Sequence, residues 1–153
     1  MKKTILTFCC LALILTFMPH AAAFEEIETT GTVIYYNEEL LDNGLTVIDQ
    51  ITDITTARSN DKTVERTNTY KDGDTVIAII TIQATFRYDG STVSVISKNV
   101  TRADTYSGWS YSQKSFTSSG GTVTLSGTLN FLWILNSSSF TMTLSCDKNG
   151  NIT

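Results

Sequence analysis

The sequence predicts an all-β fold, an antiparallel β-sandwich or flattened barrel of about eight strands built from hairpins. Three observations support this prediction. Apolar residues recur with a period of two rather than 3.6. Ser and Thr make up 38 of the 130 residues that follow position 23. Turn-forming pairs such as Asp89-Gly90 and Gly120-Gly121 separate the alternating runs.

Residues 1–23 have the three parts of a secretory signal peptide. Lys2 and Lys3 give the segment a positively charged start, and an apolar run follows at residues 5–18. The small residues Ala21 and Ala23 stand at the two positions that a signal peptidase recognises. The apolar run has 14 residues, fewer than the roughly 20 that span a bilayer. We therefore expect cleavage after Ala23 and a single secreted domain over residues 24–153, with no stable membrane anchor.

The expected mature chain excludes several kinds of chemistry. Cleavage removes Lys2, Lys3 and the single histidine, leaving nine basic against fifteen acidic residues, a net charge of −6. Cys146 is the one cysteine that remains, so an internal disulfide is excluded. Without histidine we expect no His-activated nucleophile and no His-ligated metal, and we expect no cofactor. The acidic balance argues against a nucleic-acid partner.

The strands expected in the first half of the domain follow the alternation. Residues 27–36 begin it, and residues 37–43 are expected to form one helical turn capped by Asn37 and ended by Gly44. Residues 45–57 and 62–71 are the next two strands.

The strand expected at residues 76–88 shows the clearest alternation. Its first half should be covered on both sides, because Ile77 and Ile79 add apolar residues to the second face. A two-residue Asp89-Gly90 turn would place Phe86 opposite Val93 in the strand that follows.

A second hairpin is expected around residues 119–121. We favour a three-residue loop with Gly121 in the left-handed region, because it pairs Tyr111 with Leu129 and Trp109 with Phe131. The strands would run over residues 109–118 and 122–134.

The last strand ends at Cys146, which alternates in phase with Phe140, Met142 and Leu144. We expect a small buried thiol there, the alternative being an intermolecular disulfide. Residues 147–153 resemble the opening of an EF-hand calcium loop, with oxygen-bearing residues at alternate positions. However, Ile152 stands where that loop needs Gly, so we expect a polar turn instead.

Two groups of residues are candidates for a functional site. Tyr106, Trp109 and Tyr111 lie near Ser107 and Ser110 and could stack on a sugar ring, although they could equally be core aromatics. Tyr35 and Tyr36 allow the same two interpretations. Asp49 and Asp53 would share one side of a strand, as a glycosidase pair requires, but we expect solvated surface carboxylates.

Several segments carry a resemblance to known proteins. They are residues 84–90, 108–111, 120–121, 125–127 and 146–150. Together they resemble small secreted β-rich proteins of Gram-positive bacteria, a group with no assigned function. The resemblance covers the C-terminal half of the chain and implies export and a β-rich fold. It carries no active-site residues.

These observations favour an exported bacterial β-sandwich that binds or assembles without catalysis, because an activated nucleophile is missing. The expected partner is a protein or a glycan. Two alternatives stay open, a carbohydrate-binding module that uses exposed aromatic residues and a membrane-active β protein.

Overall fold

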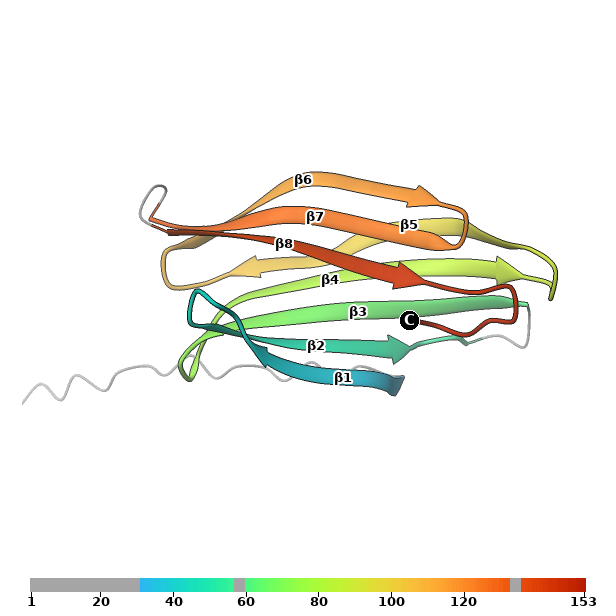
Figure 1. Cartoon of the computed structure of the whole chain (residues 1–153), viewed down its shortest axis with the longest axis horizontal. Helices are drawn as coiled ribbons and strands as arrows, with labels where there is room; N and C mark the ends of the chain where they lie inside the picture. Colours follow the sequence, from blue (N-terminus) through green and yellow to red (C-terminus); the bar gives the residue numbers. More distant parts are fainter. Residues whose placement is uncertain (1–30, 57–59, 133–135) are drawn as a thin grey trace, which may run out of the picture.

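The computed structural model describes residues 31–56, 60–132 and 136–153. The all-β prediction is confirmed, with eight antiparallel strands in two sheets and no helix in these residues (Figure 1). The strands are β1 (Thr32–Leu40), β2 (Leu45–Asp53), β3 (Asp61–Asp72), β4 (Thr75–Tyr88), β5 (Val93–Thr105), β6 (Trp109–Ser119), β7 (Thr122–Phe131) and β8 (Asn136–Ser145). The expected signal peptide and residues 27–30 of the expected first strand lie outside the described residues.

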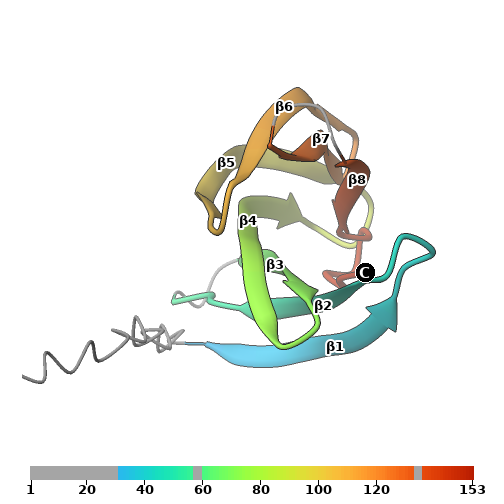
Figure 2. The same cartoon turned by 90° about the vertical axis from the view of Figure 1, so that its left-hand side faces the viewer.

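The two sheets form the layers of a sandwich. The larger sheet has the order β1-β2-β3-β4-β5, and the smaller has the order β6-β7-β8. Figure 2, which looks along the strands, shows β1 at the edge of the larger sheet that lies farthest from β6, β7 and β8. Neighbouring strands in each sheet are consecutive in the chain, so each pair is a hairpin, as the sequence predicted.

Alternating apolar residues of both sheets meet in one core. The fully buried side chains include five from β3 and β4 and five from β7 and β8, namely Val64, Ile80, Ile82, Ala84, Phe86, Val123, Leu125, Leu129, Met142 and Leu144. Ile77 and Ile79 are also buried, which confirms that the first half of β4 is covered on both sides.

The expected helical turn after the first strand is wrong. Asn37 to Leu40 continue β1, and the chain reverses over the four residues that follow. Gly44 closes this reversal with a φ of 83°, and its N–H donates to the carbonyl oxygen of Leu41 at 2.9 Å. Pairing with β2 satisfies the backbone groups of residues 37–40 that face β2, and this pairing takes the place of the expected helical turn.

The loop between β4 and β5 is longer than predicted, and the predicted pairing of Phe86 with Val93 is wrong. Tyr88 lies opposite Val93, and Phe86 lies opposite Val95. The cause is Asp89, whose Oδ1 accepts hydrogen bonds from the N–H groups of Ser91 and Thr92 and so stabilises a four-residue loop. The slip from the predicted register is two residues, so the apolar faces still coincide.

The loop between β6 and β7 is also different, but the predicted aromatic pairing is confirmed. The loop contains Gly120 and Gly121 alone, and Gly120 has the positive φ of 56°. A bulge between Gln113 and Ser115 then shifts the register by one residue. Beyond the bulge, Tyr111 lies opposite Leu129 and Trp109 lies opposite Phe131, as expected.

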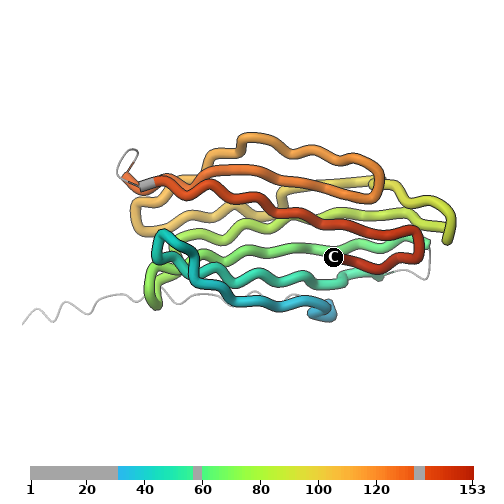
Figure 3. Tube along the Cα trace, in the orientation of Figure 1, coloured from blue at the N-terminus to red at the C-terminus, as the bar shows by residue number. Residues whose placement is uncertain are grey.

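The segment after β8 folds back and closes one end of the sandwich. Figure 3 shows it in red at the same end of the molecule as the loop between β4 and β5. Ser145 and Thr153 exchange two backbone hydrogen bonds of 2.8 and 2.9 Å, and the N–H of Gly90 donates to the carbonyl oxygen of Lys148 at 2.8 Å. This contact between remote segments helps to determine the loop conformation at Gly90.

Candidate functional site

The aromatic candidates do not share an exposed surface. Trp109 is buried at the start of β6, where its ring packs against Phe131 with a centroid distance of 5.3 Å. Tyr111 is half-buried and stacks on Phe140 at 6.0 Å, and burial raises the pKa of its hydroxyl. Tyr106 is the exposed member of the three, with its hydroxyl 3.5 Å from the carboxylate of Asp104.

This arrangement favours the core interpretation for Trp109 and Tyr111. A sugar-binding platform needs flat ring faces open to solvent, and the core covers the indole of Trp109. A ligand-binding role for Tyr106, Trp109 and Tyr111 stays a prediction. Of these three aromatic side chains, Tyr106 is the one that is exposed and that a sugar ring could contact.

Asp49 is not the solvated carboxylate that the sequence led us to expect. It points into the space between the sheets, where Nε of Arg66 donates to Oδ1 at 2.8 Å and Nη2 of Arg66 donates to Oδ2. Nη1 of Arg66 also donates to the carbonyl oxygen of Thr143 on β8. The guanidinium therefore pairs with β2 of the larger sheet and binds the backbone of the smaller one.

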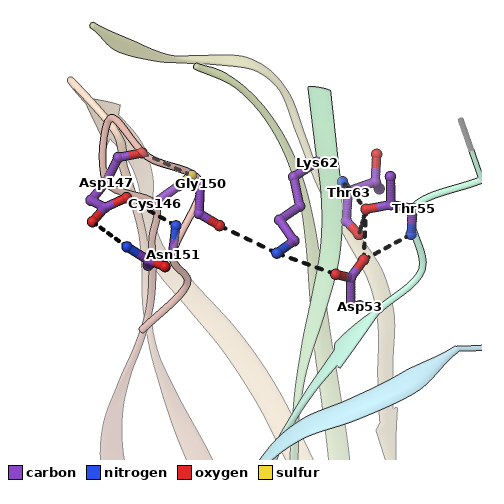
Figure 4. A network of polar contacts seen from close by, with 8 residues as sticks. All are labelled: Asp53, Thr55, Lys62, Thr63, Cys146, Asp147, Gly150 and Asn151. Carbon is purple, nitrogen blue, oxygen red and sulfur yellow. Dashed lines mark hydrogen bonds and ion pairs between the residues drawn. The ribbon is translucent and has the colours of Figure 1, made fainter. Parts of the chain in front are cut away.

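Asp53 lies further along β2 and has its own partners (Figure 4). Its carboxylate accepts hydrogen bonds from the N–H and hydroxyl of Thr55 at 3.0 and 2.6 Å, and it lies 3.4 Å from Nζ of Lys62. Partial burial alone would raise the pKa of Asp53, but these hydrogen bonds and the ammonium group hold it below its ordinary value. Asp49 and Asp53 therefore each have separate partners within the protein.

A shallow polar depression of about 390 Å³ lies beside the loop between β4 and β5. Two of its three charged groups form an ion pair, because Nε and Nη2 of Arg87 each donate to Asp61 at 2.8 Å, and the third is the carboxylate of Asp89. These hydrogen bonds lower the pKa of Asp61, and the backbone N–H groups of Thr92 and Ser91 lower the pKa of Asp89. The depression thus holds ionised carboxylates and lacks the raised pKa that a general acid needs.

Sequence reasoning missed this ion pair, although a signal existed. Asp61 is the first residue of β3, Arg87 is the last but one of β4, and these oppositely charged residues are direct partners in the ladder between the two strands. A hairpin drawn between residues 61–72 and 75–88 brings the two charges to the same end of the strand pair, and the bulge between Tyr70 and Lys71 places them directly opposite each other.

Residues 147–153 form the polar turn that we predicted. Oδ1 of Asp147 accepts hydrogen bonds from the N–H groups of Asn149 and Asn151 at 2.8 and 2.9 Å, and Oδ2 accepts one from the side chain of Asn151 at 2.7 Å. These donors lower the pKa of Asp147 and occupy the oxygens that a cation would need. Within the described residues no cluster of three or more metal-ligating side chains occurs.

Cys146 is buried, as predicted, and forms no disulfide within the described residues. Its Sγ donates a hydrogen bond to the carbonyl oxygen of Asp147 at 3.4 Å, and burial raises the pKa of the thiol. Lys62 lies beside this segment, where its Nζ donates to the carbonyl oxygen of Gly150 at 3.2 Å (Figure 4). A buried thiol with a raised pKa is a poor nucleophile.

β1 is a further feature that could bind a partner. Every residue of this edge strand is exposed, including the large apolar side chains of Val33, Ile34, Tyr35, Tyr36 and Leu40. These five are most of the large apolar side chains that the described residues expose. Sequence reasoning noted the two tyrosines but could not tell an edge strand from an inner one.

Both faces of β1 contribute to this surface. Tyr36 and Leu40 lie opposite Gln50 and Thr46, on the outer face of the sheet. Tyr35 lies opposite the buried Ile51, on the face that continues the core side of the sheet, and yet remains 43% exposed. No strand of the smaller sheet covers it, because β6, β7 and β8 lie over the other end of the larger sheet (Figure 2).

Comparison with known proteins adds no assignment, since the chain matches no known protein family, no curated protein and no solved structure. The described residues contain no helix of the length and apolarity needed to cross a bilayer.

Proposed function

We propose that this chain is a secreted, non-catalytic β-sandwich protein of bacterial origin that acts by binding, and that β1 is its contact surface. The observation that carries the proposal is the exposure of five large apolar side chains along one edge strand. Exposed apolar residues gathered on one element are typical of interaction sites. An edge strand also offers unpaired backbone donors and acceptors to a partner.

The state of the polar groups supports a binding role over catalysis. The carboxylates of Asp49, Asp53, Asp61 and Asp147 all accept hydrogen bonds or ion pairs within the protein. The thiol of Cys146 is buried. A catalytic acid, base or nucleophile would need a free functional group in a cleft.

The test compares two lysine substitutions at exposed apolar sites. Tyr36→Lys alters β1, and Ile96→Lys alters an exposed side chain of β5 as the matched control. We expect Tyr36→Lys to weaken retention of the protein on surface fractions of the secreting cells by about tenfold or more, because a central aromatic anchor is lost. Equal retention of the two variants and the parent would contradict the proposal.

Secretion has a separate test. The positive start, the short apolar run and the small residues at Ala21 and Ala23 support export and cleavage. N-terminal sequencing of the protein from the culture medium should begin at Phe24. A lipid-modified Cys9 or Cys10 in a cell-bound form would contradict this expectation.

A further inference from the structure

We propose that the outer face of the smaller sheet binds an uncharged polysaccharide chain. This face lies on the far side of β6, β7 and β8 from the core, and no other strand of the described residues lies over it (Figure 2). The inference goes beyond the proposed function, because it adds a second binding surface that does not involve β1.

The outer face, which we call the hydroxyl face, carries hydroxyl groups at almost every position. Its residues alternate with the buried side chains of β7 and β8, and the two ladders align them in rows of three across the sheet. The five rows are Ser119 with Thr122 and Ser145, Thr117 with Thr124 and Thr143, Ser115 with Ser126 and Thr141, Ser112 with Thr128 and Ser139, and Ser110 with Asn130 and Ser137. Asn130 is the one residue among them without a hydroxyl.

Charged groups are almost absent from these three strands, although the chain as a whole carries a net charge of −4. Lys114, which lies at the bulge in β6, is the one charged residue in β6, β7 and β8. A charged polymer would lose water from its charges here without gaining partners of opposite charge. The hydroxyl face therefore favours an uncharged ligand.

One row of the hydroxyl face is free to bind such a ligand. In the row of Thr117, Thr124 and Thr143, no hydroxyl group is hydrogen-bonded to another residue in the described part of the chain. A threonine hydroxyl and a sugar hydroxyl can each donate and accept a hydrogen bond, so a polysaccharide matches the chemistry of this row.

Thr128, on the central strand of the same face, independently points to a ligand. It is 8% exposed, and its hydroxyl has no hydrogen-bond partner among the described residues. A buried hydroxyl without a partner is unfavourable, and a ligand that bonds to it removes that cost. Nζ of the exposed Lys114 donates to the hydroxyl of Ser139 on β8 at 3.2 Å, so its side chain crosses β7 beside Thr128. Displacement of this lysine by a sugar would open Thr128 to the ligand.

The dimensions of the hydroxyl face suit one extended chain. With a rise of about 3.3 Å per residue and strands about 4.8 Å apart, its rows cover about 26 Å by 10 Å. This area is about a third of the roughly 800 Å² that each partner buries in a standard protein complex, and no position on the face is aromatic. Neighbouring strands are rotated by about 20–25°, and a flexible chain can follow this twist whereas a flat crystal surface cannot. A polysaccharide therefore fits the face better than a globular protein or a crystal does.

Affinity electrophoresis of the secreted protein in native gels tests the inference. Each gel contains one of the uncharged polysaccharides hydroxyethyl cellulose, dextran, pullulan and galactomannan, or the anionic carboxymethyl cellulose. We expect at least one uncharged polysaccharide to slow the migration of the protein and carboxymethyl cellulose to leave it unchanged. Unchanged migration with all the uncharged polysaccharides overturns the inference, and so does slowing by carboxymethyl cellulose alone.

Substitution of threonine by valine locates the site, because it removes a hydroxyl and keeps the branched shape. Thr124→Val should raise the Kd for the polysaccharide about two- to tenfold, the effect of one hydrogen bond. Thr69→Val is the matched control and should leave the Kd unchanged. Thr69 is also half-buried and without a side-chain hydrogen bond in the described residues, but it lies on β3 of the larger sheet, between Ile48 and Ile79.

Two further variants separate binding from folding and from the proposed function. Thr128→Val should raise the Kd by a similar factor while the urea midpoint stays equal or rises, because its hydroxyl has no partner within the described residues. Tyr36→Lys should bind the polysaccharide as the parent does. If Tyr36→Lys alone weakens binding, the polysaccharide lies on β1, which overturns this inference and leaves the proposed function standing. Equal binding by the parent, Thr124→Val and Thr128→Val also overturns it.

Discussion

Replacing Gly127 by alanine tests the packing between the aromatic rings of the smaller sheet. Gly127 is buried in β7 between Tyr111 of β6 and Phe140 of β8, whose rings stack at 6.0 Å. A Cβ at this position would lie 2.8 Å from Cζ of Phe140 and 2.9 Å from Cε2 of Tyr111. Both distances are shorter than a carbon–carbon contact permits, so the rings must move.

Two effects of opposite sign decide the magnitude. Alanine in place of glycine normally stabilises a strand by about 0.5–1 kcal/mol, because the unfolded chain has less freedom to lose. Overpacking of a core costs about 1–3 kcal/mol. We therefore expect Gly127→Ala to lower the free energy of unfolding by about 1–2 kcal/mol and the Tm by about 4–8 °C for a domain of this size.

Urea denaturation measures this change as a lower midpoint with an unchanged slope. Phe140→Leu supplies the control, because it shortens one of the two rings that collide with the new methyl group. In that background Gly127→Ala should be neutral or stabilising, so the two substitutions should couple by about 1 kcal/mol or more. Stabilisation by Gly127→Ala in the parent protein, or the same loss in both backgrounds, would refute the packing argument.

Three other predictions follow from single residues. Gly90 has a φ of 84° with open space around it, so Gly90→Val should cost about 1–3 kcal/mol through backbone strain, and an unchanged urea midpoint would contradict this. Thiol reagents should label Cys146 slowly in the native protein and rapidly in denaturant, and fast native labelling would show that the strand end is open. Hydrogen bonds from Asn151 and its neighbours lower the pKa of Asp147 from its ordinary 3.8, so its stabilising effect is complete above that pH and is lost as the pH falls below it. The stability difference between the parent and Asp147→Asn should therefore shrink below pH 3.8, and a constant difference would exclude the linkage.

Alternation along the chain predicted the strands well because it is a local property. Each buried apolar residue of β4 and β7 occupies the phase that the sequence pattern assigned to it, whereas Thr81 and Thr128 are buried on the opposite face. Period-two patterns report which face a residue occupies, and that face is retained when a ladder slips by two residues. For this reason the misplacement of Phe86 opposite Val93 did not alter the predicted core.

Loop lengths were harder to predict because remote groups determine them. The sequence of Asp89-Gly90 favours a two-residue turn, but the N–H of Gly90 donates to Lys148, a residue 58 positions later. At the second hairpin, a bulge near Lys114 produces the pairing of Trp109 with Phe131 that we had attributed to a longer loop. A bulge and an extra loop residue have the same effect on register beyond them, so the pattern alone cannot separate the two.

The alternation of apolar residues could not predict the exposure of β1, because this exposure also depends on remote parts of the chain. Tyr35 has the same local features as a core residue, and it lies beside the buried Ile51 in the ladder. Whether such a residue is covered depends on the second sheet. That sheet has three strands against five, and it does not extend over β1 (Figure 2).

The burial of Asp49 could have been predicted from the alternation of apolar residues along its strand. Asp49 alternates in phase with Val47 and Ile51, both buried, so the phase already placed a carboxylate on the core face. A buried carboxylate requires a paired donor. Arg66 occupies the corresponding phase of the next strand, between the buried Val64 and Asn68, and is a diagonal neighbour of Asp49 in the ladder.

The ion pair between Asp49 and Arg66 also helps to determine how the two sheets pack against each other. A slip of β2 against β3 would separate Asp49 from Arg66 and leave a charge unpaired in the interior, which costs about 3–5 kcal/mol. Because Nη1 of Arg66 also donates to the carbonyl oxygen of Thr143, the same guanidinium helps to position β8 over β3. One ion pair therefore links the register within the larger sheet to the placement of the smaller sheet upon it, and that placement leaves β1 uncovered.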